Sequence, residues 1–195
     1  MQTLKISGSA RERLCCPACR AALVSRDDRL ACANSGCGLE FPVLDGIPVL
    51  INDRNSVFSI SDFVERRNTT FDLHRSGVRE FISRLIPSIG WNVRGKENYE
   101  KLGALLASMP GTPRVLVLGG SILGKGMEAL AQNRSLDWVE SDVSMGPRTM
   151  LIGDAHDIPF QDETFDAVIA QAVLEHVVDP YRCAREIHRV LKKQG

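Results

Sequence analysis

Two apolar runs joined by a short polar turn dominate the C-terminal half of the chain. The first run ends at Gly153-Asp154-Ala155, and the second, Phe165 to Ala170, ends at Gln171, ahead of a helix start at Asp179-Pro180. We interpret both runs as strands whose carboxyl ends point the same way. Ligands of open α/β sheets bind beyond such ends. The segment therefore predicts an α/β fold with a ligand site beside Asp154 and Gln171.

Length and charge narrow the class of protein. A chain of 195 residues accommodates one domain and a small module. Its formal net charge is zero, so no general attraction to nucleic acid or anionic membrane is expected. Between Ala131 and Pro180, acidic residues outnumber the two basic ones, Arg134 and Arg148, which disfavours a polyphosphate site there. The N-terminus lacks a signal-peptide apolar core, and no membrane-length apolar run occurs. We expect a cytoplasmic protein without a membrane span.

Five of the six cysteines lie between Cys15 and Cys37. In a chain without a secretion signal, such clustering indicates metal ligands rather than disulfides. Cys16 and Cys19 form a Cys-x2-Cys knuckle, and Cys32 and Cys37 a Cys-x4-Cys knuckle, with a hairpin expected between them. Four thiolates at Zn–S distances of about 2.3 Å complete a tetrahedral shell. We therefore predict a structural zinc site without an open catalytic position.

Cys15 competes with Cys16 for the first ligand position. The knuckle spacing and the rigid turn provided by Pro17 favour Cys16. The sequence that follows, Glu40 to Leu50, resembles the FPVxDGIPVL ending of zinc-ribbon modules related to the zinc-binding activator subunits of methyltransferases. The resemblance covers about Leu14 to Ile51. It departs from the common pattern in the four-residue gap of the second knuckle, which lengthens a loop but removes no ligand.

The middle of the chain predicts two helices. The first has Ser61-Asp62 as its cap, carries an apolar face from Phe71 to Ile86 and ends at Pro87. The second runs from about Lys96 to Met109. Three polar side chains of this region, which could contact a cofactor carboxylate, are interpreted as solvated helix surface: Arg94, Asn98 and Tyr99.

A glycine-rich turn follows the apolar run Arg114 to Leu118 and precedes a helix expected at Met127 to Gln132, which is a nucleotide-binding layout. Gly119-x4-Gly124-Lys125 matches the first seven positions of a P-loop. Gly126 stands where a P-loop needs a hydroxyl for magnesium, so this interpretation is disfavoured. A dinucleotide fingerprint is also disfavoured, because Ser121 occupies the place of its second glycine.

The turn resembles motif I of the class I S-adenosylmethionine-dependent methyltransferases. Val117 stands where that motif carries an acidic residue, and Ser121-Ile122-Leu123 replaces its tight GxG. Downstream, the sequence has the family's GDA, PF turn, FDxVI and LEHV elements in order. The resemblance covers about Pro113 to Gly195. It implies a Rossmann-like parallel sheet, of which this chain contains about four strands.

The resemblance also implies a cofactor site. Asp142, about 20 residues beyond the glycine turn, is positioned to accept hydrogen bonds from ribose hydroxyls. Asp154 would accept from the adenine 6-amino group, and the Ala155 N–H would donate to ring N1. His176 is interpreted as a loop-packing residue, and no catalytic residue is assigned; His156 and His188 are interpreted as surface or packing residues. The predicted S-adenosylmethionine-binding residues are Gly119, Gly120, Ser121, Asp142, Val143, Asp154, Ala155, Gln171 and Ala172.

These patterns divide the chain into a zinc ribbon at 1–52, a helical connector at 53–112 and a C-terminally truncated methyltransferase-like domain at 113–195. We predict an S-adenosylmethionine-dependent methyltransferase whose acceptor is a small molecule, glycan, RNA or protein. Phe165 to Ala170 is expected to form an uncovered apolar sheet edge, which a protein partner would cover. The alternative is a non-catalytic zinc-binding adaptor or regulator with a vestigial methyltransferase half.

Overall fold

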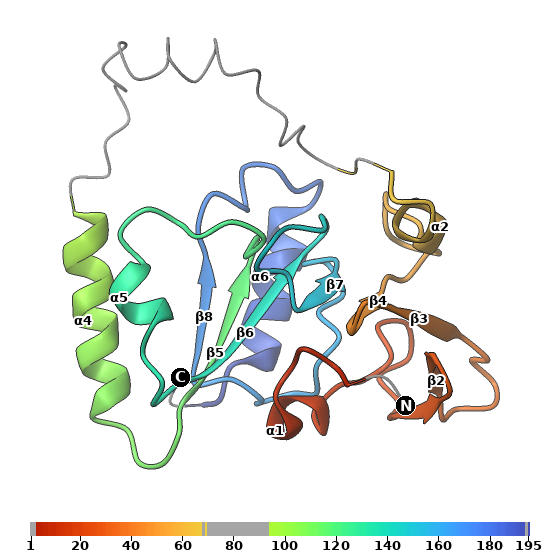
Figure 1. Cartoon of the computed structure of the whole chain (residues 1–195), viewed down its shortest axis with the longest axis horizontal. Helices are drawn as coiled ribbons and strands as arrows, with labels where there is room; N and C mark the ends of the chain where they lie inside the picture. Colours follow the sequence, from red (N-terminus) through yellow and green to blue (C-terminus); the bar gives the residue numbers. More distant parts are fainter. Residues whose placement is uncertain (1–2, 68, 70–93, 194) are drawn as a thin grey trace, which may run out of the picture.

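The computed structural model describes residues 3–67, 69, 94–193 and 195. One continuous sheet of eight strands forms the centre of this part of the chain, in the order β1-β2-β3-β4-β7-β6-β5-β8 (Figure 1). The strands are β1 (Leu23–Arg26), β2 (Arg29–Cys32), β3 (Glu40–Leu44), β4 (Ile47–Leu50), β5 (Arg114–Leu118), β6 (Asp137–Asp142), β7 (Leu151–Gly153) and β8 (Ala167–Ala170).

Helices lie on both sides of this sheet. They are α1 (Gly8–Arg11), α2 (Ile60–Val64), α4 (Gly95–Ala107), α5 (Glu128–Ala131) and α6 (Pro180–Val190). Helices α4 and α5 lie next to each other, while α6 lies on the opposite side of β5 and β8 (Figure 1). Among the described residues, no helix has both the length and the apolar character needed to cross a membrane.

The C-terminal part has the predicted Rossmann-like arrangement. Strand β5 pairs in parallel with β6 on one side and with β8 on the other, and β6 pairs in parallel with β7. Val115 to Leu118 of β5 are all buried, as expected for a parallel strand covered on both faces. Because the four strands are parallel, their carboxyl ends meet at one edge of the sheet, where the glycine turn and both apolar runs also end.

The N-terminal strands extend the same sheet. The predicted hairpin is formed by β1 and β2, and β3 and β4 continue it in antiparallel order. Strand β4 then pairs in parallel with β7, with Val49 opposite Ile152 and Leu50 opposite Gly153. Backbone pairing therefore connects the predicted zinc-ribbon segment directly to the parallel sheet.

Strand β8 is the last strand in the order of the described sheet, as the predicted edge requires, but apolar layers cover both of its faces. Phe165 is fully buried, and Ala167 and Ile169 are at most 9% exposed. On one face, Leu106 of α4 belongs to the same core as Ile169. On the other face, Val190 of α6 belongs to the core that contains Phe165.

The N-cap of α2 differs from expectation, whereas the N-cap of α6 is the predicted one. Ser59, rather than Ser61-Asp62, is the N-cap of α2, and its backbone N–H donates to Asp62 Oδ2 at 2.9 Å. Helix α6 begins after its predicted cap, Asp179, and ends at Val190, where the next residue, Leu191, forms a parallel bridge with Phe165. The predicted second connector helix corresponds to α4. The expected apolar face from Phe71 to Ile86, with Pro87, lies outside the described residues.

Candidate functional site

A cavity of about 430 Å³ opens at the carboxyl ends of β5, β6, β7 and β8. Its volume falls within the usual range for small-molecule sites, about 300–1,000 Å³. Gly120 does not line the cavity; a Cβ added there would lie 3.0 Å from Glu140 Cβ, so the backbone passes close to β6. The eight other residues predicted to bind a cofactor all line it: Gly119, Ser121, Asp142, Val143, Asp154, Ala155, Gln171 and Ala172.

The turn after β5 depends on glycine at two points. Gly119 has φ 71°, a left-handed conformation that glycine adopts without strain. At Gly124, an added Cβ would lie 2.1 Å from Gln171 Oε1. A side chain at position 124 would therefore displace the end of the Gln171 side chain.

Asp142 connects the end of β6 to the glycine turn. Its Oδ2 accepts from the Ser121 N–H at 2.9 Å, and its Oδ1 accepts from the Ser144 N–H at 2.9 Å and from the Ser144 hydroxyl at 3.1 Å. Glu140 is instead ion-paired with Arg148 at 2.6 Å and does not line the cavity. A carboxylate offers about four acceptor sites, so Asp142 retains acceptor capacity toward the cavity.

Asp154 lies at the end of β7 and is 5% exposed. Its Oδ1 accepts from the His156 backbone N–H at 2.9 Å and lies 2.6 Å from His156 Nδ1. The Asp179 N–H donates to His156 Nε2 at 3.0 Å, so Nε2 is an acceptor and Nδ1 carries the proton. His156 lines the cavity, and its interpretation as a surface or packing residue missed this contact.

Gln171 and Ala172 follow β8. Gln171 Oε1 accepts from the Tyr99 hydroxyl at 2.7 Å, so the side-chain NH₂ of Gln171 remains available to the cavity. Tyr99 belongs to α4, and its interpretation as solvated helix surface is wrong because it is half-buried against Gln171. Ala172 has φ 53°, which turns the chain sharply away from the strand.

The wall of the cavity also includes residues that the sequence patterns did not indicate. Val57 and Phe58 follow β4 and line it together with residues of the methyltransferase-like segment. Val57, Ile122 and Val178 are 71%, 57% and 75% exposed, so the mouth of the cavity has an apolar rim.

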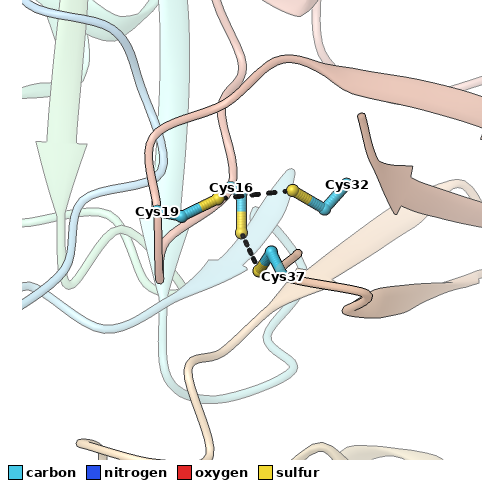
Figure 2. Close-up of side chains that lie close together, drawn as sticks. All are labelled: Cys16, Cys19, Cys32 and Cys37. Carbon is cyan, nitrogen blue, oxygen red and sulfur yellow. Dashed lines mark hydrogen bonds between the residues drawn. The ribbon is translucent and has the colours of Figure 1, made fainter. Parts of the chain in front are cut away.

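A second site lies at the N-terminal knuckles. Figure 2 shows the side chains of Cys16, Cys19, Cys32 and Cys37 converging, and their sulfur atoms all lie within 4.8 Å of one another. The Cys16 and Cys37 sulfurs are 3.8 Å apart, and those of Cys19 and Cys32 are 3.4 Å apart. Tetrahedral zinc with Zn–S bonds of about 2.3 Å requires S–S distances of about 3.8 Å. The four thiols therefore fit a zinc ion.

The surroundings of the thiols differ. The Ala21 backbone N–H, which favours the thiolate, lowers the pKa of Cys19 to about 7. Burial raises the pKa of Cys16 to about 12, so a thiolate there requires a cation beside it. Cys15 is fully buried, forms an isolated backbone β-bridge with Ala22 and is not part of the cluster. The geometry thus favours Cys16 over Cys15 as the ligand.

Buried charges connect the first knuckle to the parallel sheet. Glu186 of α6 pairs with Arg20 at 2.7 Å and with Arg189 at 2.8 Å, and its Oε2 also accepts from the Ile158 N–H. Burial raises the pKa of Glu186, but the hydrogen bond from Arg189 and the charges of both arginines outweigh it and place the pKa below its ordinary value. Arg20 also donates to the Ile158 carbonyl at 2.7 Å.

Known proteins resemble parts of this chain. Residues 123–195 match a family model described as "Methyltransferase domain". Demethylmenaquinone methyltransferase of Thermotoga maritima is 42% identical over 45 residues, which are 23% of this chain and 20% of that protein. The chain thus spans about a fifth of the length of this curated relative.

Two further similarities concern a small protein and a solved structure. A UPF0434 protein of Pseudomonas savastanoi pv. phaseolicola is 34% identical over 53 residues, which are 27% of this chain and 87% of that protein. The crystal structure of a putative S-adenosyl-L-methionine-dependent methyltransferase from Methanococcus maripaludis has a TM-score of 0.39 at 16% identity, covering 66% of this chain and 65% of that one.

Proposed function

We propose that the cavity of this chain binds S-adenosylmethionine for methyl transfer. The premise is that the chain belongs to the UPF0434 family and carries a class I S-adenosylmethionine-dependent methyltransferase domain. The observation that carries the proposal is the convergence of eight of the nine expected residues, from four separate strand ends, on one cavity.

The proposed roles follow the chemistry of the cofactor. Asp142 accepts hydrogen bonds from the ribose hydroxyls, and Asp154 accepts one from the adenine 6-amino group. The Ala155 N–H donates to ring N1, while Gln171 and Ala172 lie beside the methionine end. When bound, the cofactor supplies a methyl group on a sulfonium, whose transfer depends mainly on positioning the acceptor in line. The contribution of the chain is therefore to orient the cofactor and exclude water.

Titration calorimetry tests cofactor binding. We expect the zinc-loaded chain to bind S-adenosylmethionine and Asp142→Ala to bind it at least tenfold more weakly, since a charge-assisted hydrogen bond contributes about 1.5–3 kcal/mol. Asp28→Ala is the matched control, because Asp28 is exposed and pairs only loosely with Arg29 at 4.0 Å. Absence of binding by the unaltered chain, or equal binding by Asp142→Ala, contradicts the proposal.

We further propose that the four-cysteine cluster holds one structural zinc. All four positions of a tetrahedral shell are filled by thiolates, so no position is open for catalysis. The expected zinc content is one per chain, lost in Cys32→Ser and retained in Cys15→Ala. Elemental analysis of the purified variants measures this content. A zinc-free native chain, or loss of zinc only in Cys15→Ala, contradicts the assignment.

The rim of the cavity favours an apolar acceptor. Val57, Ile122 and Val178 expose apolar surface at the mouth, and the Thermotoga maritima relative is named for demethylmenaquinone. We propose that the acceptor is a quinone-like small molecule and not a glycan or RNA, because a glycan or RNA would need polar or basic contacts at the rim. Mass spectrometry of demethylmenaquinone incubated with the chain and cofactor tests this preference; methylation of RNA or glycan alone contradicts it.

The non-catalytic adaptor remains the second candidate function, and the methyltransferase family match does not favour it. It predicts a stable, partner-bound protein with one zinc and no turnover on any acceptor. A single methylated product in the mass spectrometry experiment excludes it.

A further inference from the structure

The segment after β4 reaches the base of the proposed adenine site. Because Leu50 pairs with Gly153, both strands end at the same level, and the residues that follow each strand face one another. Asn52 Nδ2 donates to Asp157 Oδ2 at 3.2 Å, and the Ser56 hydroxyl donates to Asp154 Oδ2 at 2.5 Å. The N-terminal half of the chain thus contacts two acidic residues, Asp154 and Asp157, of the loop after β7.

Ser56 completes the set of donors around the Asp154 carboxylate. His156 donates twice to Oδ1, once from its backbone N–H and once from Nδ1. Nδ1 carries the ring proton because Nε2 accepts a hydrogen bond from the Asp179 N–H. Ser56 provides the donor that the structure places on Oδ2. Because Asp154 is 5% exposed, water cannot readily replace a lost donor. The orientation of this carboxylate therefore depends on residues from both halves of the chain.

A carboxylate oxygen held by one donor retains a second lone pair. For Oδ2 of Asp154, a residue that lines the cavity, that lone pair suits an N–H of a bound ligand. An adenine 6-amino group supplies such a donor, whereas a 6-oxo base would bring a carbonyl oxygen toward a negative charge. Sites that hydrogen-bond a ligand in this way reject analogues that leave their polar groups unpaired.

We propose that Ser56 is a positioning residue that fixes Asp154 for recognition of the 6-amino group, and thereby sets the base specificity of the cofactor site. This inference rests on the proposed function. Val57 and Phe58, the next two residues, form part of the cavity wall, so the same segment supplies both a wall and a donor. The segment that follows the metal-binding module is then a component of the cofactor site.

Calorimetric titration with two ligands tests the inference. The ligands are S-adenosylhomocysteine and its 6-oxo counterpart, S-inosylhomocysteine. We expect the unaltered chain to prefer the adenosyl ligand by at least tenfold. Ser56→Ala should weaken binding of the adenosyl ligand by roughly fivefold or more, in line with loss of one hydrogen bond to a charged group. The same substitution should change the affinity for the inosyl ligand by less than about twofold, so that most of the preference for the adenosyl ligand is lost.

Ser56→Thr retains the hydroxyl and should restore the preference, and Asn55→Ala, at an exposed neighbouring position, should leave both affinities unchanged. Equal weakening of both ligands in Ser56→Ala would indicate a merely structural role and overturn the inference, as would an unchanged preference. Failure of the unaltered chain to bind S-adenosylhomocysteine instead refutes the proposed function, and this inference with it.

Discussion

The cysteine cluster and the proposed cofactor cavity are both built on one continuous sheet, yet they are assembled in opposite ways. All four cysteines of the cluster come from one short stretch, Cys16 to Cys37. The cavity combines Val57 with residues as distant as Val178. The difference shows that a site made by local spacing can be recognised in the sequence, whereas a site made by strand pairing depends on contacts between remote segments.

The two regions are nevertheless connected through the loop after β7. The Cys15 N–H donates to the Pro159 carbonyl at 3.0 Å, and Arg20 donates to the Ile158 carbonyl at 2.7 Å. This loop begins at Asp154 and Ala155, the residues proposed to bind adenine. Disturbance of the cluster should therefore reach the cavity.

Removal of zinc has the largest expected effect. Structural zinc contributes about 10–16 kcal/mol in small zinc-finger peptides, so its loss should unfold the knuckles and lower the melting temperature by roughly 10 °C or more. S-Adenosylhomocysteine binding should be lost at the same time. Scanning calorimetry and titration with and without chelator measure both effects. Restoration by added zinc is the control, and unchanged binding after chelation would show that the two regions are independent.

Glu186→Gln tests the ionic connection between the regions. Loss of one partner of a buried pair costs about 3–5 kcal/mol, and we expect about 3 kcal/mol at pH 7 because the Arg20 side chain is 35% exposed. Urea unfolding measures the free energy. Glu100→Gln, which alters an exposed pair with Lys96, should cost under about 0.5 kcal/mol.

The Glu186 contribution should also depend on pH. The pKa of Glu186 is lowered in the folded chain, so its stabilisation is complete above the unfolded pKa, about 4.3, and is lost as pH falls through the folded value. The difference between the unaltered chain and Glu186→Gln should therefore shrink in acid. A difference that stays constant from pH 7 to pH 3 contradicts the ionic account.

Tyr99→Phe has the smallest expected effect. It removes the hydroxyl that donates to Gln171 Oε1 and retains the ring. We expect the free energy of S-adenosylmethionine binding to fall by about 1 kcal/mol, or roughly fivefold in affinity, because the Gln171 side chain is then free to rotate. Tyr181→Phe is the control, since Tyr181 is 79% exposed. Equal S-adenosylmethionine affinities of the two variants would show that the Tyr99 hydroxyl does not contribute to the site.

The sequence predicted the parts of the fold that depend on local pattern. The hairpin between the knuckles, strand β5 and the cap of α6 at Asp179 are each encoded by neighbouring residues. The pairing of β4 with β7 is not local. One signal in the sequence could have indicated it, because Ile47 to Leu50 form an unbroken apolar run, and the structure buries all four residues as in a strand covered on both faces.

The unpredicted parts of the site follow from that pairing. It brings Ser56 to Asp154 and places Val57 and Phe58 in the cavity wall, although nothing in the residues around Ser56 indicates a cofactor. Tyr99 is a similar case, because its partner Gln171 lies on another element. Both contacts become visible only when the order of strands and the position of α4 are known.

One cavity at the carboxyl ends of the parallel strands is proposed to bind S-adenosylmethionine. A crystal structure of the zinc-loaded chain with S-adenosylhomocysteine tests it most directly. We expect ligand density in that cavity, with the ribose at Asp142 and the 6-amino group of adenine at Asp154. Ligand density elsewhere, or an empty cavity at saturating ligand, would contradict it.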